Sequence, residues 1–344
     1  MKQLLILTAS CAVLLSTPRL LRAASLTTTD PAFTATRLFD SSPDSFITGV
    51  ASDGRDVFYL ENEARFSGGT RPTQLLARRL AVPFIGPERL LHEFGTFLAG
   101  NFLTYADGRV FGGEFTTGGI FAVNASTGAF DALGTVPANY DGRVFGGVLF
   151  LSHGTNSGSA ITKFDLVADP AGGGQKLGVG ELVLEVGESS GPLEFTGAGD
   201  LLYASSGGGV YKFTAAEVAI AATGPDDLAL DAQHLAIADE HFSYLAAENE
   251  DPAWGTTFDQ LKRVRPQTGS TAVIAESAPD TAGHLDFVGE TLYANVTDFT
   301  AGNRHSSIYS IVPEPSSSVF LMFAVSTAFA ARRPRAAVRD RKTP

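Results

Sequence analysis

The feature that most constrains the fold is a repeated heptapeptide. Residues 107–113 read Asp-Gly-Arg-Val-Phe-Gly-Gly, and the same seven residues recur at 141–147, an offset of 34. Looser copies share its form, a turn followed by an apolar and aromatic stretch, and begin at Asp53, Gly199, Asp239 and Gly289. Internal repetition at intervals of this size predicts an array of similar supersecondary units.

Each copy lies in similar surroundings, which predict further strands. Short apolar strands precede the turn at residues 45–51, 101–105, 193–196, 234–238 and 284–288. Third strands are expected at 120–123, 161–164, 210–213, 261–264 and 308–311, and fourth strands at 130–133 and 271–275. Asp-Gly suits the hairpin between the first two strands, because glycine adopts the positive φ of tight turns. Four strands per unit of about 47 residues predict the blades of an all-β propeller.

The number of units predicts a ring of six blades, and five or seven blades are the alternatives. The sixth unit reaches its third strand at residues 308–311 and then lacks a fourth. An unassigned strand at 33–39 would complete that blade and close the ring, which removes an exposed sheet edge. A short helix is expected at 215–222. The alternative architecture is a two-sheet sandwich with a second domain.

The charge of the chain excludes two classes of partner. The net charge is −12, and it reaches about −20 when the basic residues near both ends are set aside. Such a body repels nucleic acids and anionic lipid, so neither is expected as a partner. It favours solubility and could attract divalent cations.

The N-terminal segment has the pattern of a signal peptide. Lys2 precedes an apolar stretch at 4–15, and small residues at 23–25 suit cleavage near Ser25. We therefore expect residues 1–25 to form a signal helix that is removed. Cys11, the single cysteine, would leave with it, which excludes disulfides and thiol chemistry from the body at 26–311.

The C-terminal segment, residues 312–344, has a second ordered pattern. It begins with four residues, Val312, Pro313, Glu314 and Pro315. An uncharged, largely apolar run follows at 319–331, and then the basic residues Arg332, Arg333 and Arg335. A helix over the apolar run is about 20 Å long at ~1.5 Å per residue, which is short for a ~30 Å hydrocarbon core. The basic cluster predicts a cytoplasmic end, with Pro313 and the body outside.

This order resembles the PEP-CTERM sorting tail. The resemblance covers about the last 33 residues and implies recognition by an exosortase, a membrane-embedded cysteine protease. It implies a bacterial protein exported through the inner membrane, anchored transiently or permanently by its tail, and then surface-bound or extracellular. Proteins with this tail are associated with exopolysaccharide and biofilm matrix, so carbohydrate or matrix contact is what the resemblance implies.

No sequence motif in the body identifies a reaction or a catalytic residue. The sequence contains no zinc-helix motif, nucleophile elbow, phosphate loop or dinucleotide fingerprint. Trp254 is expected in a loop, where it would stack on a sugar or pack the loop down.

Four residues form a candidate metal site at the channel mouth: Glu194, His234, His284 and Asp286. Six-bladed propeller hydrolases and lactonases hold a divalent cation at a similar place, and calcium would suit the two carboxylates. The alternative is ordinary polar residues that bond to one another and to water.

The sequence thus predicts an exported envelope or extracellular-matrix protein that acts as a non-enzymatic binding or structural module without a required cofactor. The alternative is a metal-dependent hydrolase or lyase at the channel mouth.

Overall fold

A computed structural model describes residues 24–314, apart from residues 64–70, 82–83, 96–97, 99, 157, 187–188, 206–208, 222–227, 230–240, 249–252, 266–269 and 300–304. The expected signal helix, the apolar run at 319–331, and Pro315, Arg332, Arg333 and Arg335 therefore lie outside the described residues. Among the residues described, no helix has both the length and the apolar character needed to cross a bilayer.

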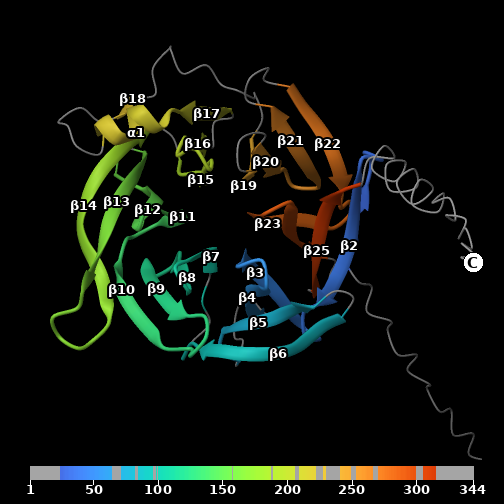
Figure 1. Cartoon of the computed structure of the whole chain (residues 1–344), viewed down its shortest axis with the longest axis horizontal. Helices are drawn as coiled ribbons and strands as arrows, with labels where there is room; N and C mark the ends of the chain where they lie inside the picture. Colours follow the sequence, from blue (N-terminus) through green and yellow to red (C-terminus); the bar gives the residue numbers. More distant parts are fainter. Residues whose placement is uncertain are drawn as a thin grey trace, which may run out of the picture.

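Six antiparallel sheets surround a central axis and form a six-bladed β-propeller, as the repeats predict (Figure 1). Blade 1 consists of β3 (Ser45–Ser52), β4 (Asp56–Glu63), β5 (Gln74–Ala81) and β6 (Phe84–Glu93). Blade 2 consists of β7 (Gly100–Ala106), β8 (Arg109–Glu114), β9 (Gly119–Asn124) and β10 (Phe130–Thr135). Blade 3 consists of β11 (Asn139–Phe145), β12 (Val148–Gly154), β13 (Ser159–Ala168) and β14 (Gln175–Val186), and the short β18 (Leu228–Ala229) pairs parallel to β14.

Blade 4 has three strands in the described part of the chain, β15 (Leu193–Phe195), β16 (Leu201–Ala204) and β17 (Val210–Phe213). The helix α1 (Ala215–Ala221) follows at the position that the composition predicts. Blade 5 consists of β19 (Tyr244–Ala247), β20 (Ala253–Thr256), β21 (Gln260–Arg265), β22 (Ser270–Glu276) and β1 (Thr27–Thr28). Blade 6 consists of β23 (Thr281–Val288), β24 (Thr291–Asp298), β25 (His305–Pro313) and β2 (Phe33–Asp40).

The innermost strands β3, β7, β11, β15, β19 and β23 lie around the axis (Figure 1). Hydrogen bonds between neighbouring inner strands connect the first residues of one strand to the first residues of the next, and the last residues to the last. Asn101 at the start of β7 donates to the backbone oxygen of Asn139 at the start of β11, and Ser52 at the end of β3 donates to Asp286 near the end of β23. The inner strands therefore run in one direction. We call the face where they begin the upper face and the face where they end the lower face.

The N-terminal strand closes the ring, and this prediction is confirmed. β2 pairs antiparallel with β25, with Phe33 opposite Pro313 and Asp40 opposite Ser307. The sequence did not predict β1, which adds a fifth strand to blade 5 beside β22. The chain before β1 is also held, because the Tyr309 hydroxyl donates to the Ala24 carbonyl at 2.8 Å. The N-terminal segment thus joins blades 5 and 6.

The two identical heptapeptides occupy different structural positions, which corrects one prediction. Asp107 and Gly108, with φ of 49° and 78°, form the turn between β7 and β8. In blade 3 the turn falls instead on Gly146 and Gly147, with φ of 60° and 81°, and the preceding residues lie within β11. Tertiary contacts decide this register. A Cβ at Gly142 would lie 2.6 Å from the ring of Phe102, so this close inter-blade packing requires glycine inside the strand.

The strand assignment of blade 5 also needs correction. Residues 234–238, expected as its inner strand, lie outside the described residues, and β19 occupies the inner position beside β15 and β23. Trp254 lies in the second strand, β20, and not in a loop. It is 2% exposed and packs edge-on against Phe33 with ring centroids 5.3 Å apart. The hypothesis that Trp254 stacks on a sugar is therefore wrong.

Trp254 links the N-terminal strand to blade 5, so its removal should weaken ring closure. We expect Trp254→Ala to lower the free energy of unfolding by about 3–5 kcal/mol, because it leaves a large cavity in the core. Urea unfolding followed by circular dichroism measures the loss. Phe258→Ala is the control, because Phe258 is 71% exposed, and its effect should stay within about 0.5 kcal/mol. Equal effects of the two substitutions would contradict this account.

Candidate functional site

The axis of the propeller contains a network of buried and half-buried ionisable side chains. β11 contributes Asp141 and Arg143, β15 contributes Glu194, and β23 contributes His284 and Asp286. The Arg143 Nε donates to Glu194 Oε2 at 2.8 Å, and its Nη1 donates to Asp141 Oδ1 at 2.9 Å. A positive side chain therefore lies where the carboxylates of neighbouring blades meet.

Arg143 connects three inner strands. Besides the two carboxylates, it donates to the carbonyl oxygens of Gly142 at 2.9 Å and Leu245, in β19, at 3.3 Å. The side chain is only 10% exposed. The neighbouring carboxylates outweigh the effect of burial and raise the guanidinium pKa, so Arg143 stays charged. A buried charge is tolerated only when it is paired and hydrogen-bonded, and this network meets both conditions.

Asp141 completes the link between blades 3 and 4. One of its oxygens accepts from the backbone nitrogen of Gly142 at 2.8 Å, and the other accepts from that of Leu193 at 3.0 Å. Burial raises the pKa of Asp141 to about 6, while Arg143 and these donors oppose the rise. The carboxylate is thus mainly ionised at neutral pH.

The pKa values of Asp286 and His284 are shifted further from their ordinary values. Asp286 Oδ2 accepts from the Ser52 backbone nitrogen at 2.5 Å, which joins blade 6 to blade 1. Burial raises the pKa of Asp286 to about 7, and Arg143 opposes the rise. Burial and then Arg143 lower the pKa of His284 to about 3, and its ring lies 3.9 Å from the ring of Tyr244. His284 is therefore neutral at physiological pH.

Three of the four residues proposed as metal ligands lie on inner strands of the ring, and each makes an internal contact. Glu194 pairs with Arg143, Asp286 binds a backbone nitrogen, and His284 packs on Tyr244, while His234 lies outside the described residues. Within the described ranges, no three His, Cys, Asp or Glu side chains are grouped to hold a metal ion. The four-residue metal site thus stays a prediction, and one of its carboxylates already binds a guanidinium.

Sequence reasoning missed Asp141 and Arg143 as members of the axial network. It placed Asp141 in a hairpin turn by analogy with Asp107, and so put Arg143 in the second strand instead of the inner strand. No local signal separates the two copies. The glycine pair that forms the turn at Gly146-Gly147 also occurs at Gly112-Gly113, where it lies inside β8.

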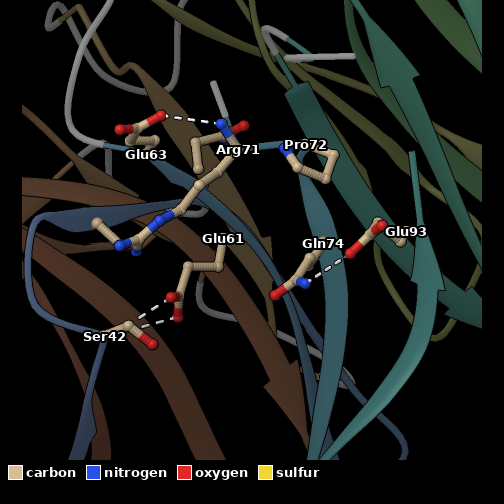
Figure 2. Close-up of a pocket in the computed structure, with 9 residues that line it drawn as sticks. Ser42, Glu61, Glu63, Arg71, Pro72, Gln74 and Glu93 are labelled. Carbon is tan, nitrogen blue, oxygen red and sulfur yellow. Dashed lines mark hydrogen bonds between the residues drawn. The ribbon is translucent and has the colours of Figure 1, made fainter. Parts of the chain in front are cut away.

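A pocket of about 270 Å³ opens on the upper face of blade 1 (Figure 2). It lies where β3 and β5 begin and β4 and β6 end, and no sequence motif predicted it. Its lining is polar apart from one proline and consists of Ser42, Ser45, Glu61, Asn62, Glu63, Arg71, Pro72, Gln74 and Glu93.

Hydrogen bonds hold the pocket's side chains in place (Figure 2). Both carboxylate oxygens of the buried Glu61 lie 3.3 Å from the backbone nitrogen of Ser42, which donates to them. On the other side of the pocket, Gln74 Nε2 donates to Glu93 Oε2 at 2.9 Å. Glu63 accepts from the Arg71 backbone nitrogen at 3.0 Å.

A hydrogen-bonded layer supports the pocket from below. Asn62 donates to the Thr48 hydroxyl at 2.8 Å and accepts from the Thr73 hydroxyl. The Asn62 side chain is thereby fixed, since both its amide nitrogen and its amide oxygen are hydrogen-bonded. The pocket offers carboxylate and amide acceptors, amide and guanidinium donors, and an excess of negative charge.

No protein-family profile and no curated protein sequence matches the chain. Solved propeller structures do resemble it. A gluconolactonase from Xanthomonas campestris aligns with a TM-score of 0.53 at 12% identity, over 84% of this chain and 95% of that one. A PQQ-bound aldose sugar dehydrogenase from Streptomyces coelicolor aligns with a TM-score of 0.53 at 13% identity, over 82% and 99% of the two chains. A chain of a nidogen/laminin complex aligns with a TM-score of 0.50 at 8% identity, over 71% and 85%. Identities this low establish the fold alone.

The raised pKa of Asp286 makes a prediction about stability and pH. Between about pH 4 and pH 7 the folded protein keeps a proton that the unfolded chain has released. The contribution of Asp286 to stability therefore falls as the pH rises through this window. Asparagine has no such titration, and its oxygen can still accept from Ser52.

We therefore expect Asp286→Asn to gain stability relative to the wild-type protein as the pH rises from 4 to 7, by about 2–4 kcal/mol, and to gain no more above pH 8. Urea unfolding of both proteins at pH 5 and pH 8 measures the difference. The pKa of His284 is shifted in the opposite direction, but His284 is present in both proteins, so its contribution cancels when their stabilities are compared. A difference that is the same at both pH values would contradict a raised pKa for Asp286.

Proposed function

We propose that this chain is an exported binding module of the bacterial envelope, and that its upper-face pocket binds a neutral carbohydrate unit of an extracellular matrix. The observation that carries the proposal is the lining of the pocket, in which fixed carboxylate and amide groups surround about 270 Å³. Small-molecule pockets are usually mostly apolar, so a polar pocket of this kind suits a ligand that is itself covered with hydrogen-bonding groups.

The chemistry of the lining selects hydroxyl groups over other polar ligands. A carboxylate such as Glu61 accepts from hydroxyls, and an amide such as Gln74 both donates and accepts. Glu61, Glu63 and Glu93 outnumber Arg71, so an anionic ligand would be repelled. A neutral ligand with many hydroxyl groups can donate to these carboxylates and is not repelled by them. Two of the similar propellers act on sugars or sugar lactones by name, but that likeness concerns only the fold.

The position of the chain's last described residues supports the anchoring part of the proposal. Val312 and Pro313 end β25 on the lower face, and the Glu314 nitrogen donates to the Ala32 carbonyl at 2.8 Å. A tail that continues from Glu314 would leave the body on the face opposite the pocket. Anchoring by the PEP-CTERM-like tail would therefore direct the pocket away from the membrane, where matrix polysaccharide is accessible.

Replacement of Gln74 tests the pocket. We expect Gln74→Ala to weaken binding of a neutral matrix oligosaccharide about 3- to 10-fold, because it removes one hydrogen-bonding partner of the ligand. Isothermal titration calorimetry on ligands first identified with a polysaccharide array measures the change. Gln260→Ala is a matched control, since Gln260 makes the same kind of cross-strand bond to Glu276, at 3.3 Å, on another blade. If no neutral polysaccharide binds, or if both variants bind like wild type, the proposal fails.

Replacement of both prolines of the tail motif tests sorting. We expect Pro313→Ala with Pro315→Ala to leave the protein unprocessed in the membrane fraction, because an exosortase would no longer recognise the motif. The mass of the protein in membrane and extracellular fractions reports the outcome. Pro87→Ala, a proline of the body, is the control and should be processed normally. Normal processing of the double variant would remove exosortase as the proposed partner.

One observation favours a second candidate function, a metal-dependent hydrolase or lyase at the channel mouth. Asp286 is partly exposed and its pKa is raised to about 7, which suits a general acid or base at neutral pH. Hydrolysis of sugar lactones by wild type and by Asp286→Asn, with calcium and with a chelator, tests this candidate. Activity that is lost on the substitution and restored by calcium in wild type would support it.

A further inference from the structure

The lower face carries a second pocket, which differs in charge from the first. It has a volume of about 450 Å³ and lies between blades 1 and 2. Three arginines border it, Arg55 in the turn before β4, Arg79 in β5 and Arg89 in β6. Tyr105 and Ser126 border it from blade 2. In a chain with a net charge of −12, this gathering of guanidinium groups is unexpected.

Asp56 fixes two of the arginines but uses only part of their capacity. Arg79 Nε donates to Asp56 Oδ1 at 2.5 Å, and Arg89 Nη2 donates to Asp56 Oδ2 at 3.3 Å. Arg89 Nη1 also donates to the Ala125 carbonyl at 3.0 Å, so Arg89 holds blade 1 to blade 2. The two terminal nitrogens of Arg79 make no hydrogen bond to any residue in the described ranges, and its side chain is 60% exposed. A guanidinium carries five N–H donors, so the two terminal nitrogens of Arg79, which lines this pocket and a neighbouring one on blade 1, stay available to a ligand.

The backbone is arranged to place Arg79 at this point. The register between β5 and β6 shifts between Arg78 and Leu80, and such a bulge redirects the side chain within it. Gly86 lies opposite, where a Cβ would come within 2.8 Å of the Arg79 Cβ. The Arg55 loop is fixed too, because Leu80 donates to the Arg55 carbonyl at 2.7 Å. The arginines therefore border a prepared pocket and are not scattered surface charges.

The charges of the pocket define the ligand. Three guanidinium groups face two carboxylates, Asp53 and Asp56, and both carboxylates are used internally. Asp56 binds the arginines, and Asp53 accepts from the backbone nitrogens of Arg55 and Asp56 at 2.8 Å and 2.6 Å. Charges beyond about 8 Å are largely screened at physiological salt, so a bound group interacts with this local positive charge. The acidic body still repels a dense polyanion. A ligand with single, well-separated anionic groups on a neutral chain meets both conditions.

We propose that this lower-face pocket binds the carboxylate of a sugar acid within an otherwise neutral polysaccharide. The two terminal nitrogens of Arg79 pair with the two carboxylate oxygens, as guanidinium groups do in bidentate ion pairs. Arg55 supplies a second positive charge, and Tyr105 and Ser126 face the sugar ring and its hydroxyls. The choice of a polysaccharide rests on the proposed matrix-binding function, whereas the recognition of a carboxylate rests on the arginines alone. With the upper-face pocket, the module would hold two polysaccharide segments at once.

Calorimetric titration with two matched probes tests the inference. One probe is an oligosaccharide with one glucuronate per repeat, and the other is the same oligosaccharide with its carboxyl groups reduced to alcohols. We expect the acidic probe to bind wild type at least 10-fold more tightly, and Arg79→Gln to abolish this preference. Arg37→Gln is the control, because Arg37 is 47% exposed on β2 and its replacement changes the net charge equally. That variant should keep the preference.

A second variant guards against a general loss of structure. Arg55→Gln removes an exposed pocket arginine that does not bind the buried Asp56, so this variant should fold normally. Its preference for the acidic probe should fall at least threefold. Equal binding of the two probes to wild type, or an unchanged preference in Arg79→Gln with an unchanged melting temperature, would overturn the inference. So would an equal loss in Arg37→Gln.

The same titrations separate this inference from the proposed function. Gln74→Ala should weaken the reduced probe and keep the preference for acid, whereas Arg79→Gln should leave the reduced probe unaffected. If Arg79→Gln abolishes the preference for the acidic probe and Gln74→Ala has no effect on binding, the lower-face site is supported and the upper-face pocket is rejected. The reverse result would support only the upper-face pocket.

Discussion

The hydrogen bonds between β2 and β25 are the interaction on which the rest of the structure depends. Apart from the polar contacts across the axis, each blade packs against its two neighbours, so an open ring would expose one unpaired edge and two apolar blade faces. β2 covers that edge, and Phe33 at its start packs on Trp254 of the neighbouring blade. Closure fixes the distances between inner strands. The lower-face pocket and the axial network require those distances, because each is built from residues of more than one blade.

The axial network shows how a closed ring fills its centre without a large apolar core. Arg143 reaches carboxylates or carbonyls of three inner strands, and Asp286 joins blade 6 to blade 1 through Ser52. These bonds tie the blades together in a region where side chains from all blades converge. Removal of a single partner from such a network leaves another charge buried and unpaired, which costs far more than the net contribution of the pair. The network is therefore as well suited to structural specificity as to chemistry.

The sequence predicted the features that depend on local repetition. Alternating apolar strands, glycine turns and an unpartnered strand at 33–39 were sufficient for the all-β class, the six blades and the closure. What it could not predict depends on tertiary contacts. The identical peptides at 107 and 141 adopt different registers because Gly142 must admit the ring of Phe102 and Asp141 must reach Leu193. Trp254 was misplaced for the same reason, since its burial depends on Phe33, more than 200 residues away in the sequence. Neither pocket has a sequence motif, because the lining residues come from separate strands whose spacing only the assembled blades determine.

The strand that closes the ring is made early, and its partner β25 is the last strand of the body to be made. During synthesis β2 therefore has no sheet to join until nearly the whole body has left the ribosome and, for an exported chain, the translocation channel. Until then the strand edge of β2 and the side chain of Phe33 are exposed. An exposed strand edge favours aggregation, so chaperone binding matters most in this interval. Chain connectivity alone thereby makes ring closure the last step in formation of the body.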